Sequence, residues 1–110
     1  MIEDRIQKIE ARLRESAHIP DPSRAELLKL LAALKEEVRT LAESHEEDAQ
    51  SITGFVDASA HEVTRVEKKP KLVEASLNGL TASVESFEAS HPKLAETVNQ
   101  IAVVLSNMGI

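Results

Sequence analysis

The sequence predicts an all-α fold: an antiparallel helical hairpin or coiled coil with a short N-terminal helix, forming a helical bundle that is oligomeric. Three observations predict it. Aliphatic residues recur in steps of three and four, which is the period of an amphipathic helix. Prolines stand only at positions 20, 22, 70 and 92, so long stretches are uninterrupted. Phe55 and Phe87 are the only aromatic residues, so Leu, Ala, Ile and Val must build the core, as in helical bundles.

The first two expected helices cover residues 2–17 and 22–67 of one helical domain, 1–110. The first has an apolar row with steps of four, three and four, and it ends before Pro20, since proline restricts the residue before it. The second has a long apolar seam in which Gly54 costs about 1 kcal/mol, and a break near residues 44–54 is left open. The two rows are Ile2, Ile6, Ile9 and Leu13, then Leu27, Leu31, Leu34, Val38, Leu41, His45, Asp48, Ile52, Phe55, Val56, Ser59, Val63 and Val66.

Two further stretches, residues 70–90 and 92–108, are each expected to be helical. Their seams are in phase across His91 and Pro92, which favours one continuous helix. The restriction that Pro92 places on His91 favours a break instead. Both alternatives stay open at this point. The seam residues are Val73, Leu77, Leu80, Val84, Phe87, Leu94, Val98, Ile101, Leu105 and Met108.

If the matching phase of the two seams means that the helix continues through Pro92, the chain forms a helical hairpin. Residues 22–67 and 70–108 would then form two long antiparallel helices, the first about 69 Å long at the standard rise per residue. The short link between them would bring Val38 opposite Ile101 and would place the polar residue Asp48 opposite His91.

The C-terminal stretch looks too apolar for a chain that stands alone. After Glu96 there is no charged side chain in the remaining 14 residues, and the apolar residues spread around the helix. A helix that is apolar on most sides must be covered on most sides. We therefore expect a homo-oligomer, with a dimer favoured, whose interface is formed by Val98, Ile101, Val103, Val104, Leu105, Met108 and Ile110.

Composition excludes several classes of function. The chain carries 13 basic and 19 acidic residues, a formal charge of −6, which disfavours nucleic-acid binding. It has no cysteine, so disulfides and thiolate chemistry are impossible. Charges run through the first ten residues and no apolar stretch could span a bilayer, so we expect a cytoplasmic protein without a membrane partner. No catalytic motif or cofactor-binding loop is present, and we expect neither enzymatic activity nor a cofactor.

Histidine and carboxylate pairs are the best candidates for metal binding. Glu15 with His18, and Glu88 with His91, have the E-x-x-H spacing that carboxylate-bridged di-iron bundles use. The other glutamates those centres need do not lie on the seams, so chance or helix capping is the favoured interpretation.

Two charge clusters have functional alternatives of their own. Glu43 with residues 45–48 could bind a divalent cation, and Arg65, Lys68, Lys69 and Lys71 could contact an acidic partner. The favoured interpretations are a solvated helix face and a solubilising turn.

A family resemblance lies at the C-terminus. The segments Phe87-Glu-Ala-Ser-His-Pro-Lys-Leu94 and Leu105-Ser-Asn-Met-Gly-Ile110 together resemble bacterial domain-of-unknown-function family 4404. The N-terminal stretch is similar more loosely, through Leu13, Ile19-Pro-Asp and Leu27-Leu28. The resemblance implies a small helical protein and implies no activity. It also makes the His91-Pro92 junction a family feature.

The sequence therefore favours a small helical protein of unknown function that acts as a structural or protein–protein interaction module. One alternative is a metal-binding helical bundle that uses His and Glu residues. Another is a non-catalytic regulator whose protein partner is an enzyme.

Phe87 is expected to anchor the core beneath the His91-Pro92 junction. Replacing a buried phenylalanine by alanine removes its transfer energy and leaves a cavity, so Phe87→Ala should lower the free energy of unfolding by about 3–5 kcal/mol. Chemical denaturation of both proteins measures this loss. A melting temperature that barely changes would refute the anchor.

Overall fold

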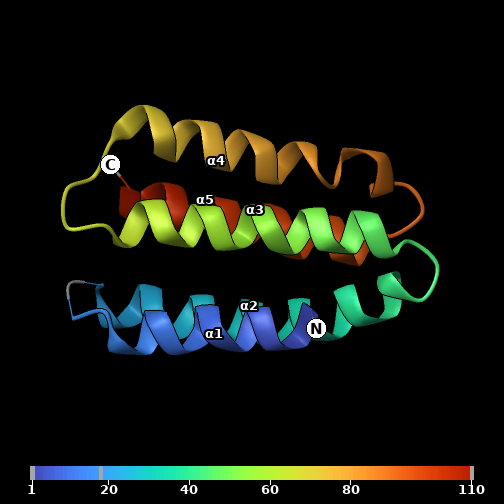
Figure 1. Ribbon diagram of the computed structural model, residues 1–110, viewed down its shortest axis with the longest axis horizontal. Coiled ribbons are helices and arrows are strands. Elements are labelled where there is room, and N and C mark those ends of the chain that lie inside the picture. Colours follow the sequence, from blue (N-terminus) through green and yellow to red (C-terminus); the bar gives the residue numbers. More distant parts are fainter. Residues whose placement is uncertain (1, 18, 110) are drawn as a thin grey trace.

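The computed structural model describes residues 2–17 and 19–109, and it confirms an all-α protein (Figure 1). Successive helices run in opposite directions along the long axis of the molecule. None of the helices in the described residues is long and apolar enough to cross a membrane. The elements are α1 (Ile2–Glu15), α2 (Asp21–Ala42), α3 (Glu46–Thr64), α4 (Pro70–Ala82), the 3-10 helix η1 (Glu85–Phe87) and α5 (Pro92–Gly109).

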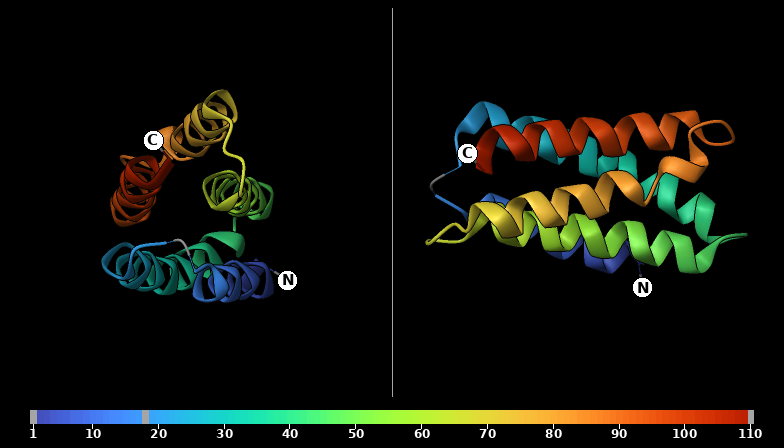
Figure 2. Two further views of the ribbon diagram at one scale, coloured as in Figure 1. Left: turned by 90° about the vertical axis from the view of Figure 1, so that its left-hand side faces the viewer. Right: turned by 90° about the horizontal axis from the view of Figure 1, so that it is seen from above.

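Four of these helices form a bundle, and α1 packs on its outside. Each of α2, α3, α4 and α5 contacts the next one around the bundle, and α5 closes it against α2. Seen end-on, α1 lies against the edge formed by α2 and α3 (Figure 2). The principal dimensions are 37 × 25 × 21 Å.

The predicted seams supply most of the core. Aliphatic side chains from all five α-helices are buried together, with Val84 and Phe87 closing the core at one end. Four seam positions are exposed instead, and each lies near a turn or on an outer face: His45, Asp48, Phe55 and Val66. The fully buried large side chains are Ile6, Ile9, Leu13, Leu27, Leu31, Leu34, Val38, Leu41, Ile52, Leu80, Ile101 and Leu105.

The helical stretch expected over residues 22–67 is divided where the chain turns back at residues 43–45, at the start of the region 44–54 in which the sequence leaves a break open. The N–H groups of Ser44 and His45 both bond to the carbonyl of Leu41, at 3.2 and 2.8 Å, and close the end of α2. The next three residues are acidic and occupy the first turn of α3, where negative charge is favoured by the helix dipole. The acidic cluster is exposed, as expected for a solvated helix face, and most of it lies in the first turn of a helix. Gly54 lies inside α3 and does not interrupt it.

The stretch from 70 to 108 is divided as well. Helix α4 ends at Ala82, a single 3-10 turn follows, and α5 begins at Pro92. The carbonyl of His91 accepts the N–H of Ala95 at 3.2 Å, while the N–H of His91 bonds back to Phe87 at 2.7 Å. The restriction before proline therefore prevails over the matching phase of the seams. Phe87 is buried there, as predicted.

The expected pair of long rods is therefore replaced by shorter helices. Both stretches fold back at the same end of the molecule (Figure 1), so α2 still packs on α5 and α3 on α4. Val38 and Ile101 are both fully buried. The polar contact differs from the one expected: the ring of His45, and not Asp48, lies near His91, and Asp48 is exposed.

Arg24 ties the first helix to the second. Its guanidinium donates to the carbonyls of Leu13 and Ile19, each at 3.1 Å, and also to that of Ser16. It pairs with Asp21 at 2.6 Å as well. The group satisfies carbonyls that the end of α1 would otherwise leave without intrahelical partners.

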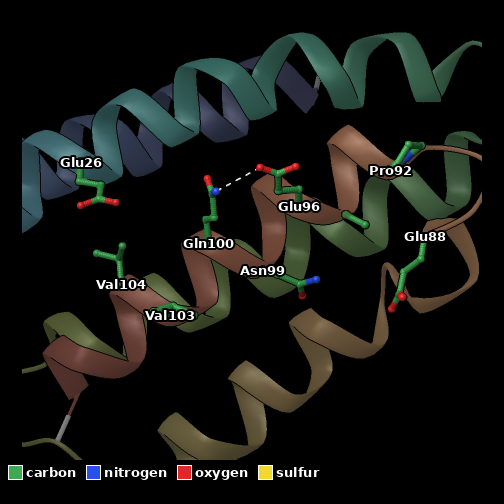
Figure 3. Close-up of a pocket in the computed structure, with 9 residues that line it drawn as sticks. Glu26, Glu88, Pro92, Glu96, Asn99, Gln100, Val103 and Val104 are labelled. Atoms are coloured by element: carbon green, nitrogen blue, oxygen red, sulfur yellow. Dashed lines mark hydrogen bonds between the residues drawn. The ribbon is translucent and has the colours of Figure 1, made fainter.

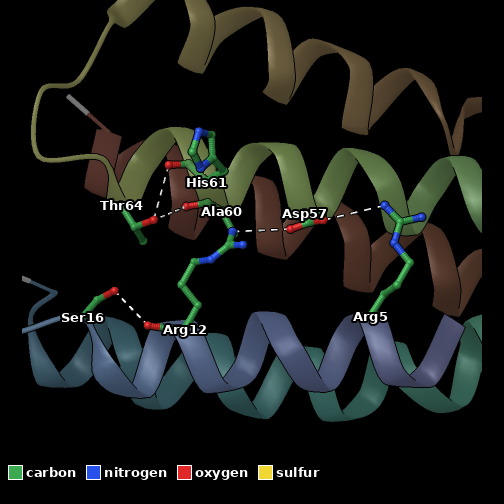
Figure 4. A network of polar contacts seen from close by, with 7 residues as sticks. All are labelled: Arg5, Arg12, Ser16, Asp57, Ala60, His61 and Thr64. Atoms are coloured by element: carbon green, nitrogen blue, oxygen red, sulfur yellow. Dashed lines mark hydrogen bonds and ion pairs between the residues drawn. The ribbon is translucent and has the colours of Figure 1, made fainter. Parts of the chain in front are cut away.

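Ion pairs on the outside of the bundle hold α1 against its neighbours. Asp57 of α3 lies between Arg5 and Arg12 of α1, at 3.7 and 3.4 Å (Figure 4). On the other side of α1, the buried carboxylate of Glu10 meets Lys35 of α2 at 3.1 Å. Because α1 has partners on both α2 and α3, its position over their shared edge is fixed.

Replacing Arg24 by methionine keeps the aliphatic stem and removes every donor. We expect Arg24→Met to lower the free energy of unfolding by about 2–3 kcal/mol, since hydrogen bonds to a charged group contribute more than neutral ones. Urea denaturation measures the change. Arg39→Met on the same helix is the matched control, because its side chain is 56% exposed and its loss should cost about 0.5 kcal/mol at most. Equal losses in both variants would contradict the role of Arg24.

Candidate interaction groove

A groove of about 700 Å³ lies between α4 and α5. Ten of its eleven lining residues are uncharged, although 29% of the chain is charged. Its polar side chains are amides and hydroxyls, and its apolar ones are aliphatic. The lining residues are Pro70, Val73, Glu74, Leu77, Asn78, Thr81, Asn99, Ala102, Val103, Ser106 and Asn107.

The groove follows from the composition of α5. Because no charged residue follows Glu96, both the inner and the outer faces of this helix are neutral over its last three turns. Val73 and Ala102 are nearly buried in the groove, whereas the neighbouring Val103 is 59% exposed. An exposed valine beside a neutral groove makes this part of the surface suited to apolar contact.

The structure separates the predicted interface residues into two sets. Val98, Ile101, Val104 and Leu105 are buried in the chain's own core, so a second copy is not needed to cover them. Helix α5 packs on α2, α3, α4 and η1, and these neighbours within the chain cover the four residues. Val103 remains exposed and Met108 is half-buried. Ile110 lies outside the described residues.

A second hollow, of about 620 Å³, lies on the other side of α5 (Figure 3). It is acidic, with Glu26 and Glu88 toward its two ends and Glu96 hydrogen-bonded to Gln100 at 3.3 Å. Val103 lines both depressions. The outer ridge of α5 therefore separates an acidic surface from an uncharged one.

A small pocket at the start of α5 contains the carboxylate of Glu37, which no sequence pattern singles out. Glu37 accepts a hydrogen bond from the buried hydroxyl of Thr97 at 3.2 Å through Oε2, while its Oε1 is buried without a hydrogen-bond partner in the described chain. Burial raises the pKa of Glu37. The Thr97 hydrogen bond and the charge of Lys93 lower it, and the charge of Glu96 raises it further. The pocket, about 290 Å³, also includes His91.

The predicted metal-ligand pairs are not brought together. Glu15 is the last residue of α1 and Glu88 follows η1, and these segments lie at opposite ends of the bundle (Figure 1). Both carboxylates are exposed. His18 lies outside the described residues. Within residues 2–17 and 19–109, no three metal-ligating side chains form a group.

The basic cluster is largely occupied by local contacts. Arg65 pairs with Glu62 at 3.0 Å, and Lys69 with Glu67 at 3.7 Å. Lys68 donates to the carbonyl of Met108 at 2.7 Å, which ties the α3–α4 link to the end of α5. These contacts favour a structural role for the turn.

The fold and the groove define a small helical-bundle protein with an uncharged depression on one face. The model of the family described as Domain of unknown function (DUF4404) matches residues 67–110. This match confirms the resemblance seen in the segments that begin at Phe87 and Leu105, and it does not cover the looser N-terminal similarity. All residues that line the α4–α5 groove fall within it. No curated protein and no solved structure matches the chain.

Glu37 should make stability depend on pH in the direction opposite to that of a salt-bridged carboxylate. Its folded-state pKa lies above the ordinary 4.5, so the folded chain holds the proton more tightly than the unfolded chain does. Protonated Glu37 therefore makes its full contribution to the free energy of unfolding below about pH 4.5. This contribution is lost as the pH rises through the raised pKa.

Glu37→Gln should therefore raise the free energy of unfolding at neutral pH, and the gain should vanish on acidification. Thermal unfolding of both proteins across this pH range measures the difference. Glu36→Gln is the matched control, because that side chain is exposed. A gain that persists in acid would contradict the assignment.

Proposed function

We propose that this protein is a small, non-catalytic interaction module that self-associates through the α4–α5 groove. The observation that carries the proposal is the near-absence of charge in a groove that lies beside the exposed Val103. Two acidic chains repel each other, so a face on which they could meet has to be neutral. Exposed apolar patches of this kind commonly mark interfaces.

A second copy of the chain fits the chemistry of the groove. Asn78, Asn99 and Asn107 carry side-chain amides, each with donors and an acceptor, and such groups can pair with their own copies across a two-fold axis. The single carboxylate, Glu74, stands among neutral groups. A strongly charged partner would find little to pair with there.

The proposed interface differs from the one expected from sequence. It keeps Val103 and moves the contact onto the outer face of α5 and the adjoining face of α4. Because α4 has only 13 residues, the face is short, about 20 Å at the standard helical rise. A contact of this size falls at the low end of specific interfaces, so the dimer should form in the micromolar range or weaker.

Other parts of the sequence-based interpretation stay predictions. A cytoplasmic location and a protein partner, including a partner enzyme that this chain would regulate, rest on composition alone.

Val103→Glu tests the proposal, because it places a charge on the neutral face without changing the core. Light scattering across micromolar to millimolar concentrations should show the wild-type mass rising toward twice 12.1 kDa. The variant should need at least a tenfold higher concentration to dimerise, a cost of about 1.4 kcal/mol.

Val66→Glu is the matched control. Val66 is fully exposed in the link before α4, away from the lining of the groove, and its replacement should leave the mass curve unchanged. A wild-type protein that stays monomeric at millimolar concentration, or a Val103→Glu variant that dimerises like the wild type, would overturn the proposal.

A further inference from the structure

Three rings meet at the end of the bundle where both long stretches fold back. The rings of His45 and His91 each lie edge-on to Phe87, with centroids 5.5 Å apart. The centroids of the two imidazoles are 6.2 Å from each other. Phe87 is buried, His91 is half-buried and His45 is exposed. The two imidazoles therefore stand over an apolar floor and are open to solvent.

Both histidines are held in the same way. The hydroxyl of Ser44 is 2.7 Å from Nδ1 of His45, and the hydroxyl of Ser90 is 3.1 Å from Nδ1 of His91. Each contact joins a histidine to the serine before it in the sequence. When Nδ1 carries the proton and donates it to the serine oxygen, Nε2 keeps its lone pair. Metal-binding histidines are commonly oriented by such a hydrogen bond to the other ring nitrogen.

We propose that His45 and His91 form a two-histidine site for a borderline transition-metal ion, with Zn²⁺ as the reference case. Neutral imidazole is a preferred ligand of zinc, nickel and copper ions. Neither histidine lines the α4–α5 groove, so the metal site can be tested independently of the dimer.

The separation of the rings is compatible with a shared ion. With a Zn–N distance of about 2.0–2.1 Å, the ion lies about 3.2 Å from each ring centroid. Two rings on one ion then have centroids about 5.2 Å apart at a tetrahedral angle and about 6.4 Å apart when they are opposite each other. The observed 6.2 Å falls within this range.

Approach to tetrahedral geometry would need the rings to move closer by about 1 Å. Both residues are placed to allow it, because His45 precedes the first residue of α3 and His91 precedes the first residue of α5. No third protein ligand gathers there among the described residues. Water would complete the coordination, and the affinity would be modest.

Binding would join the α2–α3 turn to the turn before α5. An ion that binds only the folded chain raises the melting temperature in proportion to the logarithm of its concentration. The site therefore has two readouts besides occupancy: thermal stability, and the chemical shifts of the two Nε2 atoms.

The test uses the full untagged chain and zinc chloride as the probe. Isothermal titration should show one ion per chain with micromolar affinity. Addition of zinc should raise the melting temperature, and ¹⁵N spectra should show Nε2 of His45 and His91 shifting together. His45→Asn and His91→Asn should each weaken binding at least tenfold and abolish the rise in melting temperature.

Two further variants keep the test decisive. His61→Asn is the matched control, because His61 is an exposed histidine on the surface of α3, and it should bind zinc like the wild type. His18→Asn tests the alternative site suggested by sequence and should also leave binding unchanged. Absence of binding at millimolar zinc, binding that survives loss of His45 or His91, or binding that requires His18 would overturn the proposal.

Discussion

Burial of aliphatic side chains from every helix in one shared core is the interaction on which the structure depends. The core has no disulfide and almost no aromatic residues, so its stability comes from many small contributions of Leu, Ile and Val. None of the five α-helices in residues 2–17 and 19–109 could bury its apolar face alone, and the longest of them has 22 residues. The turns between them are therefore as important as the helices, because they decide which faces meet.

The periodicity of the sequence predicted the faces of the helices well and their ends less well. The whole apolar row of the first stretch is buried, and the seams of the later stretches supply most of the remaining core. Periodicity cannot reveal a reversal when the seams before and after it are in phase, as at His91. Local chemistry could have done so: Pro92 begins one helix, and three acidic residues mark the first turn of another at Glu46.

The groove and the histidine pair were beyond sequence reasoning for a related reason. Counting apolar residues on α5 predicts that the helix must be covered, but which helices cover it depends on how the chain folds back. Four of the predicted interface residues are covered by the chain itself, and the neutral outer face that remains exposed is defined by packing. His45 and His91 are 46 positions apart in the sequence, and only the two turns bring them together.

Helix α5 connects the two proposed sites. It begins directly after His91 and its last turns line the groove. An ion that draws His91 toward His45 would act on the first turn of this helix, and a rigid helix transmits a change of tilt to its other end. If the ion binds monomer and dimer with different affinity, linkage requires that it change dimerisation by the same factor, and that dimerisation change its affinity equally. Measuring zinc affinity below and above the dimerisation concentration would give that factor directly. Equal affinities would show that the two ends of α5 act independently.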